Sequence, residues 1–264
     1  MIELHERLSE FSYGYGVTRE TEKLLASVGL TPTPFMPSLV HENEVGFDVA
    51  FDRPGAVVML QFKLGQQMQR YRSTSSALPS SPLAKPFWRF RIDCGEAQFI
   101  LLREAERKGA EVYYVAPRFS DWTIYQEAYQ TDTVLARSLM ITPREISRGI
   151  AGSGTPIGSH RIVYDNSARY VCSNPTPVDE TSPDELAKQV LTSLRQKPRR
   201  MRDFLSDLAE TPRLGRIRDR RRIGMREDLR ARARTPDDAS AAIVALEAWL
   251  VGAQAIFVTD PHGG

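Results

Sequence analysis

Three polar residues near the N-terminus have side chains suited to the hydrolysis of a phosphodiester. Asp48 lies in the short apolar segment 47–51, and Gln61 and Lys63 lie in the longer apolar segment 56–64. Residues i and i+2 of a strand share one face, so Gln61 and Lys63 are expected to point the same way. Carboxylate and amide oxygens can hold Mg²⁺, and a lysine can balance the charge that develops on a phosphate.

This chemistry requires the two apolar segments to pair as a β-hairpin. Residues 52–55, Asp-Arg-Pro-Gly, separate them and have the composition of a turn. Pairing would bring Asp48 near Gln61 and Lys63 on one face of the sheet. One carboxylate is a small ligand set for a metal ion, so cutting requires a glutamate from elsewhere in the chain. Without that glutamate, the site would bind nucleic acid and cut nothing.

Structural roles account for the same residues without any chemistry. The Lys63 side chain can extend along a sheet edge until its ammonium reaches solvent, and Asp48 can cap a turn. The sequence leaves the chemical and the structural interpretation open.

The elements that must position the site follow from periodicity. A helix is expected from Thr18 to Gly29, with Glu20 and Glu22 in its first turn, after an aromatic, glycine-containing loop at 11–16. Such glutamates could supply the missing carboxylate.

A strand, a helix and a second strand are expected further along the chain, at residues 87–92, 96–108 and 111–116. This order predicts a right-handed crossover in a partly parallel sheet. Residues 65–86 interrupt the sheet pattern and are expected to form a surface insertion with a short polar helix at 66–71.

Taken together, the helix with its glutamate, the hairpin with Asp48 and Gln61-Phe62-Lys63, and the strand–helix–strand unit resemble the PD-(D/E)XK nuclease superfamily over residues 18–116. The variant with Gln before Lys, found in Mrr-type restriction endonucleases, is the most similar. The resemblance implies an α/β fold of the restriction-endonuclease type, with a central mixed β-sheet and flanking helices. It also implies a metal-dependent nuclease, or a nuclease-like nucleic-acid-binding protein, in prokaryotic antiviral defence.

Roles for individual residues are also implied by the resemblance. The aspartate holds a divalent metal, Mg²⁺ or Mn²⁺, the residue in the Gln position helps hold metal or water, and the lysine orients water or stabilises the phosphorane. The implied catalytic residues are Asp48, Gln61, Lys63 and Glu20, with Glu22 as the alternative helix acid. The implied metal ligands are Asp48, Gln61 and Glu44, with Glu42 as an alternative to Glu44.

Composition is that of an ordinary folded protein. The chain has 264 residues, of which 41% are hydrophobic and 26% charged. Its two cysteines, Cys94 and Cys172, have no neighbours that indicate a disulfide framework or a zinc site, and no secretory signal pattern opens the sequence, so a cytoplasmic location is expected. The most apolar stretch, 239–258, contains Glu247 and Gln254, which favours a buried or interface helix over a membrane span.

Positive charge is concentrated near the C-terminus. Residues 195–234 contain fifteen Lys and Arg against six acidic residues, whereas the whole chain has a net charge of only +2. An arginine-rich region of this kind predicts a partner that is nucleic acid or an acidic protein, unless it is a solvated helix with local ion pairs. The arginines expected to contact nucleic acid are Arg199, Arg200, Arg216, Arg218, Arg220, Arg221, Arg222 and Arg226.

Two domains are expected, a nuclease-like α/β domain at 1–172 and an Arg-rich helical region at 173–264, because the polar segment 173–183 contains three prolines.

A second hypothesis treats the protein as a non-catalytic assembly subunit that recruits partner chains through the Arg-rich region. The rings of Tyr13, Tyr15, Phe87, Trp88 and Phe90 could stack on bases, although such residues are more often part of a core.

Overall fold

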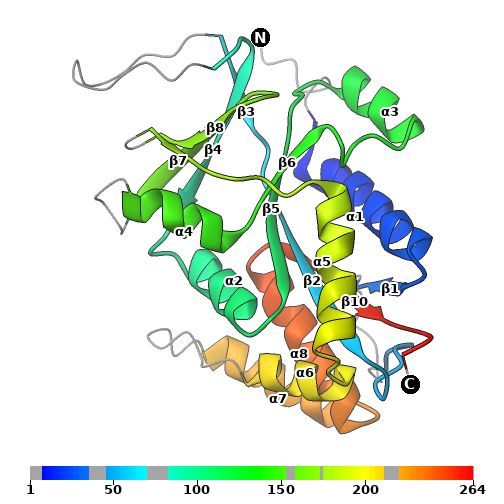
Figure 1. The fold of residues 1–264 in the computed structure, drawn as a ribbon. Coiled ribbons are helices and arrows are strands. Elements are labelled where there is room, and N and C mark those ends of the chain that lie inside the picture. The colour runs from blue at the N-terminus through cyan, green and yellow to red at the C-terminus, as the bar shows by residue number, and fades with distance from the viewer. Residues whose placement is uncertain are drawn as a thin grey trace. The chain divides into compact units, whose positions relative to one another are not determined.

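A computed structural model describes residues 8–35, 46–69, 83–152, 158–172, 175–210 and 220–263. In these ranges the chain is α/β, with eight helices and ten strands (Figure 1). The helices are α1 (Glu10–Ser27), α2 (Ala97–Arg107), α3 (Trp122–Gln130), α4 (Pro143–Gly152), α5 (Pro183–Gln196), α6 (Met201–Ala209), α7 (Arg220–Arg232) and α8 (Pro236–Leu250).

The strands form two five-stranded sheets. The first has the order β1-β10-β2-β5-β6 and consists of β1 (Thr31–Pro34), β10 (Ala253–Thr259), β2 (Gly55–Phe62), β5 (Glu111–Pro117) and β6 (Ser138–Ile141). The second has the order β3-β4-β7-β8-β9 and consists of β3 (Gln66–Met68), β4 (Phe87–Asp93), β7 (Ser159–Tyr164), β8 (Arg169–Val171) and β9 (Thr176–Pro177). All neighbouring strands of the second sheet are antiparallel.

The expected hairpin of residues 47–51 with 56–64 is wrong. Residues 46–50 form no strand, and the neighbours of β2 in the sheet are β10 and β5. Phe47 instead donates its backbone N–H to Asp238 Oδ1 at 2.9 Å, and its ring lies 5.8 Å from that of Phe257 in β10. β10, which lies nearly 200 residues further along the chain, is therefore a neighbour of β2, where the local pattern predicted the segment 47–51.

The expected crossover is also wrong, although its three elements are confirmed. β4, α2 and β5 form as the periodicity indicates, but β4 lies in the second sheet and β5 in the first. The short helix expected at 66–71 is likewise wrong, because β3 pairs with β4 over these first residues, Gln66 facing Arg89.

The chain divides into two compact units, each made of several segments. Unit 1 comprises residues 1–21, 61–100 and 113–183, and unit 2 comprises 22–60, 101–112 and 184–264. The last change of unit falls between Pro183 and Asp184, after the boundary expected at residue 172.

Unit 1 is organised around buried aromatic residues. Tyr13 of α1 packs edge-on against Phe62, with ring centroids 6.1 Å apart, and its hydroxyl donates to Ser138 Oγ at 2.7 Å. A Cβ atom on Gly14 would lie 2.6 Å from the Phe62 ring, so only glycine allows α1 to approach this closely. This contact explains why residues 11–16, expected as a packed loop, are part of a helix.

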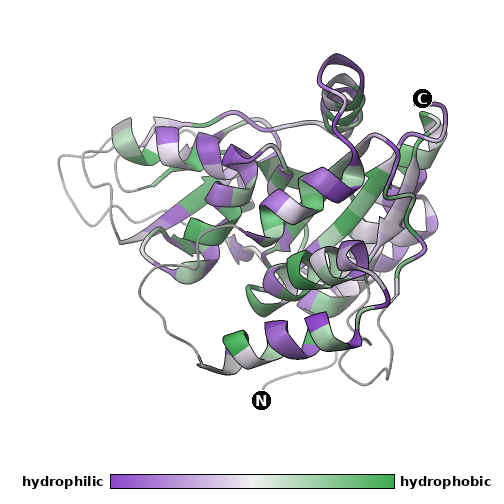
Figure 2. Cartoon of the chain, turned by 90° about the horizontal axis from the view of Figure 1, so that it is seen from below, coloured by the Kyte–Doolittle hydropathy of each residue, from purple (hydrophilic) through white to green (hydrophobic). Residues whose placement is uncertain are grey.

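Unit 2 contains α8 and β10, which replace the single apolar helix expected at 239–258. α8 begins at Pro236, where Thr235 caps it by accepting from the N–H of Asp238 at 3.1 Å, and it ends at Leu250. Gly252, with φ of 77°, turns the chain into β10. Figure 2 shows apolar residues along the strands, while most helices carry polar and apolar residues in alternation. No helix among the described residues has both the length and the apolar character that crossing a bilayer requires.

Candidate functional site

Lys63 follows directly after β2 and keeps the strand alternation. Its backbone N–H donates to Val115 O in β5 at 2.9 Å, so the ladder continues one residue beyond Phe62. Gln61 and Lys63 are therefore two residues apart in extended chain and share a face, as the sequence predicts. Gln61 is only 1% exposed, whereas Lys63 is half-buried.

The Lys63 ammonium lies in a polar cluster of unit 1. Nζ donates to Gln98 Oε1 of α2 at 2.9 Å and lies 6.0 Å from the ring centroid of Tyr114 in β5. Burial lowers the pKa of Lys63, and the negative charges of Glu10 and Glu96 oppose this change. We define the Lys63 cluster as Glu10, Gln61, Lys63, Glu96 and Gln98.

Two carboxylates of the cluster come from helix starts. Glu10 is the first residue of α1, and Glu96 immediately precedes α2. Loss of hydration raises the pKa of Glu10, and the Lys63 ammonium acts in the opposite direction. Sequence reasoning missed both residues. The available signal was weak: each glutamate stands where an acid favours a helix N-terminus, and no local pattern shows that the two starts approach Lys63.

Two buried oxygen atoms near Lys63 have no hydrogen-bond partner among the described residues. They are Gln61 Oε1 and the hydroxyl of Tyr114. The amide nitrogen of Gln61, in contrast, donates to the Phe62 carbonyl at 3.1 Å. A buried acceptor left unpaired costs about 1–3 kcal/mol, and the Gln61 oxygen retains the capacity to accept a hydrogen bond or to bind a cation.

Glu20 does not lie in the Lys63 cluster. Its two carboxylate oxygens accept the backbone N–H groups of Val134 and Leu135, at 2.9 and 2.7 Å. Burial raises the pKa of Glu20 despite these two hydrogen bonds. The glutamate thus holds the turn before β6, which corrects the expectation that it supports a metal.

The remaining predicted ligands are not brought to Lys63 by a hairpin. Asp48 is exposed, in the segment of unit 2 that Phe47 anchors. Glu44 and Glu42 lie outside the described residues, and Glu22 is half-buried in α1, where burial raises its pKa.

The Lys63 cluster contains oxygen atoms of the chemical types that hard cations prefer. Within the described ranges no group of three or more His, Cys, Asp or Glu side chains could hold a metal ion. Mg²⁺ is commonly bound by one or two carboxylates, with water and substrate phosphate completing its octahedron. Two carboxylates and the unpaired Gln61 oxygen match that requirement in kind.

The arginines expected to bind nucleic acid fall into different environments. Arg222 and Arg226 of α7 pair with Glu247 of α8, at 3.5 and 2.7 Å, and Arg199 pairs with Asp207 at 3.1 Å. Arg200 is exposed. Two others, Arg216 and Arg218, lie outside the described residues, and the side chains of Arg220 and Arg221 are not described. Local ion pairs therefore account for much of the charge of α7.

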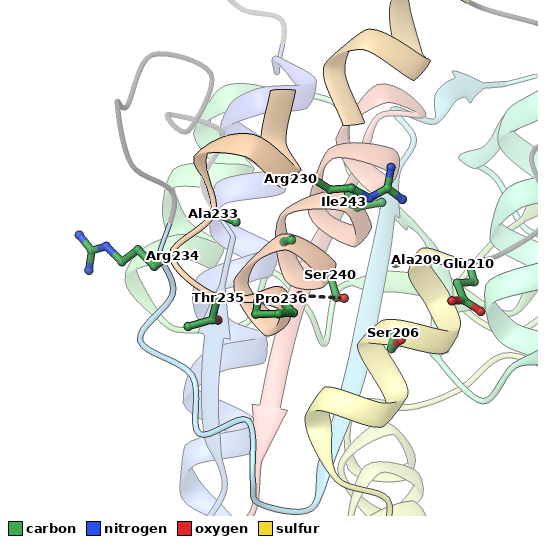
Figure 3. A pocket seen from close by; sticks show the side chains of 11 residues that line it. Ser206, Ala209, Glu210, Arg230, Ala233, Arg234, Thr235, Pro236, Ser240 and Ile243 are labelled. Carbon is green, nitrogen blue, oxygen red and sulfur yellow. Dashed lines mark hydrogen bonds between the residues drawn. The ribbon is translucent and has the colours of Figure 1, made fainter. Parts of the chain in front are cut away.

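A surface pocket of about 460 Å³ lies in unit 2 between α6 and the α7–α8 turn (Figure 3). Small side chains such as Ala209, Ala239 and Ser240 line it, and Ser240 Oγ donates to Pro236 O at 3.1 Å. Figure 3 shows Arg234 extending away from α6, so the two arginines at the pocket do not converge on one point.

Comparison with known proteins finds no matching family model, no matching curated protein and no matching solved structure.

Proposed function

We propose that this protein is a metal-dependent phosphodiesterase acting on nucleic acid, with the Lys63 cluster as its active site. One observation carries the proposal: a half-buried lysine lies on the same strand face as a buried amide oxygen that has no partner among the described residues. Desolvated cations and unpaired acceptors are costly in a folded protein, and they are found together where a charged ligand binds.

The roles follow from the atoms present. Gln61 Oε1, with Glu10 and Glu96, would hold Mg²⁺ or Mn²⁺, which when bound supplies a Lewis acid for the phosphate. Lys63 would balance charge on the non-bridging phosphate oxygens and orient the attacking water. Gln98 fixes the ammonium by accepting its hydrogen bond. In this assignment Glu10 and Glu96 replace Asp48 and Glu44, which the sequence favours.

A core of the restriction-endonuclease type remains part of the proposal, as does a prokaryotic defence role. Its support is that α1, β2, α2 and β5 follow one another along the chain, with Gln61-Phe62 at the end of β2 and Lys63 directly after it. β1 lies between α1 and β2, and β3 and β4 lie between β2 and α2. The Arg-rich C-terminal region would add affinity for the backbone through its exposed arginines, such as Arg200.

Cleavage of plasmid, linear duplex, single-stranded DNA and RNA in Mg²⁺ or Mn²⁺ tests the proposal. Lys63→Ala is expected to reduce cutting at least about 100-fold, because both charge balance and water orientation are lost. Lys23→Ala, at an exposed lysine of α1 outside both the Lys63 cluster and the Arg-rich region, is the matched control and should cut normally. Equal cutting by wild type and Lys63→Ala, with both folded, contradicts the proposal.

Two further variants separate the alternative ligand sets. Glu10→Gln and Glu96→Gln are expected to reduce cutting, whereas Asp48→Ala should leave it unchanged. The reverse outcome would restore the ligand set favoured by the sequence and refute the one proposed here.

A further inference from the structure

Half of the described side chains that are large, apolar and exposed lie on one pair of helices. There are eight such residues, and Phe11 and Tyr15 of α1 with Trp122 and Ile124 of α3 make up half of them. Phe11 is 79% exposed, Tyr15 52% and Trp122 42%. The other aromatic residues that the sequence suggested for stacking, among them Tyr13 and Trp88, are buried.

The rings on these two helices form a connected series. Tyr15 stacks on Tyr129 with centroids 6.1 Å apart and planes at 27°, and Tyr129 lies 5.9 Å from Tyr125. Trp122 lies 5.3 Å from Tyr125, and the guanidinium of Arg19 lies 4.3 Å above the Tyr129 ring. Flat rings with an interleaved guanidinium form the kind of surface on which successive bases stack.

The α1–α3 contact is part of unit 1 and is held by hydrogen bonds. The Tyr125 hydroxyl donates to Ser12 O, and Arg19 Nη1 donates to Tyr129 O at 3.2 Å. Phe11 therefore belongs to a fixed helix pair, although its own ring faces solvent. A rigid aromatic surface loses little conformational entropy when a ligand binds to it.

We propose that Phe11, Tyr15 and Trp122 form a stacking platform for the unpaired bases of single-stranded nucleic acid. This inference rests on the proposed function, and it specifies the substrate class of the Lys63 cluster. The platform and the Lys63 cluster are adjacent along the chain, which supports this choice of ligand: Phe11 is the neighbour of Glu10, and the exposed Leu64 follows Lys63. A strand stacked on the platform would thus have its phosphates within reach of the cluster.

Charge on this face predicts how binding depends on salt. Arg19 pairs with Asp132 at 3.2 Å, and Arg137 pairs with Glu127 at 2.9 Å, so the platform itself is close to neutral. The contribution of the stacked rings to affinity should therefore depend only weakly on salt, because the rings neutralise no phosphate. Binding through the Arg-rich region would instead fall steeply.

Fluorescence anisotropy with the full chain in EDTA tests the platform without cleavage. The probes are labelled oligonucleotides of about 12 nucleotides, in single-stranded DNA, single-stranded RNA and duplex forms. Phe11→Ala and Tyr15→Ala are each expected to weaken single-strand binding about tenfold and to leave duplex binding unchanged. Trp249→Ala, at an aromatic residue of unit 2 that is 46% exposed, is the matched control and should bind normally.

Several outcomes overturn the platform. Single-strand binding that is unaffected by both variants does so, as does preference for duplex by the wild type. Sedimentation that shows a dimer dissociated by Phe11→Ala would assign the surface to a second copy of the chain. If the protein binds single strands but cuts nothing in the presence of metal, the proposed function is refuted and the platform is not. If Phe11→Ala and Tyr15→Ala both cut single strands as fast as the wild type, the platform is refuted and the proposed function is not.

Discussion

Positive charge has different surroundings in the Lys63 cluster and in helix α7. In α7 and its neighbour α8, Arg222 and Arg226 share the carboxylate of Glu247, and Arg232 pairs with Asp228. In the cluster, one lysine is partly removed from water, and its strand neighbour Gln61 keeps a buried oxygen unpaired among the described residues. The arginine-rich helix α7 is therefore a surface whose charge is partly neutralised by ion pairs. The single lysine that follows the apolar strand β2 is the stronger candidate for chemistry.

Packing around two glycines should give the largest contrast between these regions. In Gly14→Ala the added Cβ meets the Phe62 ring at 2.6 Å, so we expect a loss of about 1–3 kcal/mol in the free energy of unfolding, together with reduced cutting because Glu10 is displaced. In Gly224→Ala of α7 the Cβ meets nothing within 4 Å, so we expect a gain of about 0.5–1 kcal/mol. Urea denaturation measures both, and equal effects at the two glycines would contradict the close approach of α1 to β2.

Removing the shared carboxylate of α8 tests whether the arginines of α7 are compensated. Glu247→Ala leaves two partly buried guanidinium groups without their partner, and a loss of about 1–2 kcal/mol is expected. Glu104→Ala, which removes the partner of the exposed Arg107, is the control and should lower stability much less than Glu247→Ala. A neutral Glu247→Ala would mean that α7 has spare charge for a partner.

Glu20 provides a smaller effect, which depends on pH. Its pKa is raised above 4.5 in the folded protein, mainly by burial, so the folded chain retains a proton that the unfolded chain has released. Stability is therefore expected to fall as pH rises from about 4.5 to the raised pKa, and to level off above it. Glu20→Gln should remove this part of the pH dependence in urea denaturation from about pH 4 to about pH 8. An unchanged pH profile in the variant would contradict it.

Local pattern predicted the elements better than their partners. Strands β4 and β5 and the helix α2 between them lie where periodicity places them. The start of α1 was missed, because Gly14 looks like a loop residue until the neighbouring Phe62 ring is known. The position of Gln61 and Lys63 on one strand face follows from alternation alone.

The carboxylates of the site could not be found in the same way. Glu10 and Glu96 act on the charge of Lys63 from the starts of two different helices of unit 1, and this placement is a long-range property of the fold. Asp48 looked suitable because it lies near Gln61 in sequence, but residues 46–50 form no strand. Sequence neighbourhood was therefore a good guide within β2 and a poor one outside it.

The place of β10 in the first sheet constrains how the protein folds during synthesis. Thr31 of β1 faces Thr259 of β10, so about 230 residues are made between the two paired strands, which takes on the order of ten seconds or more on the ribosome. Throughout that time the edges of β1 and β2 that will receive β10 have no native partner. The nascent chain thus has a period of exposure to strand-mediated aggregation that ends only when residues 253–259 leave the exit tunnel, and general chaperones would act in that interval.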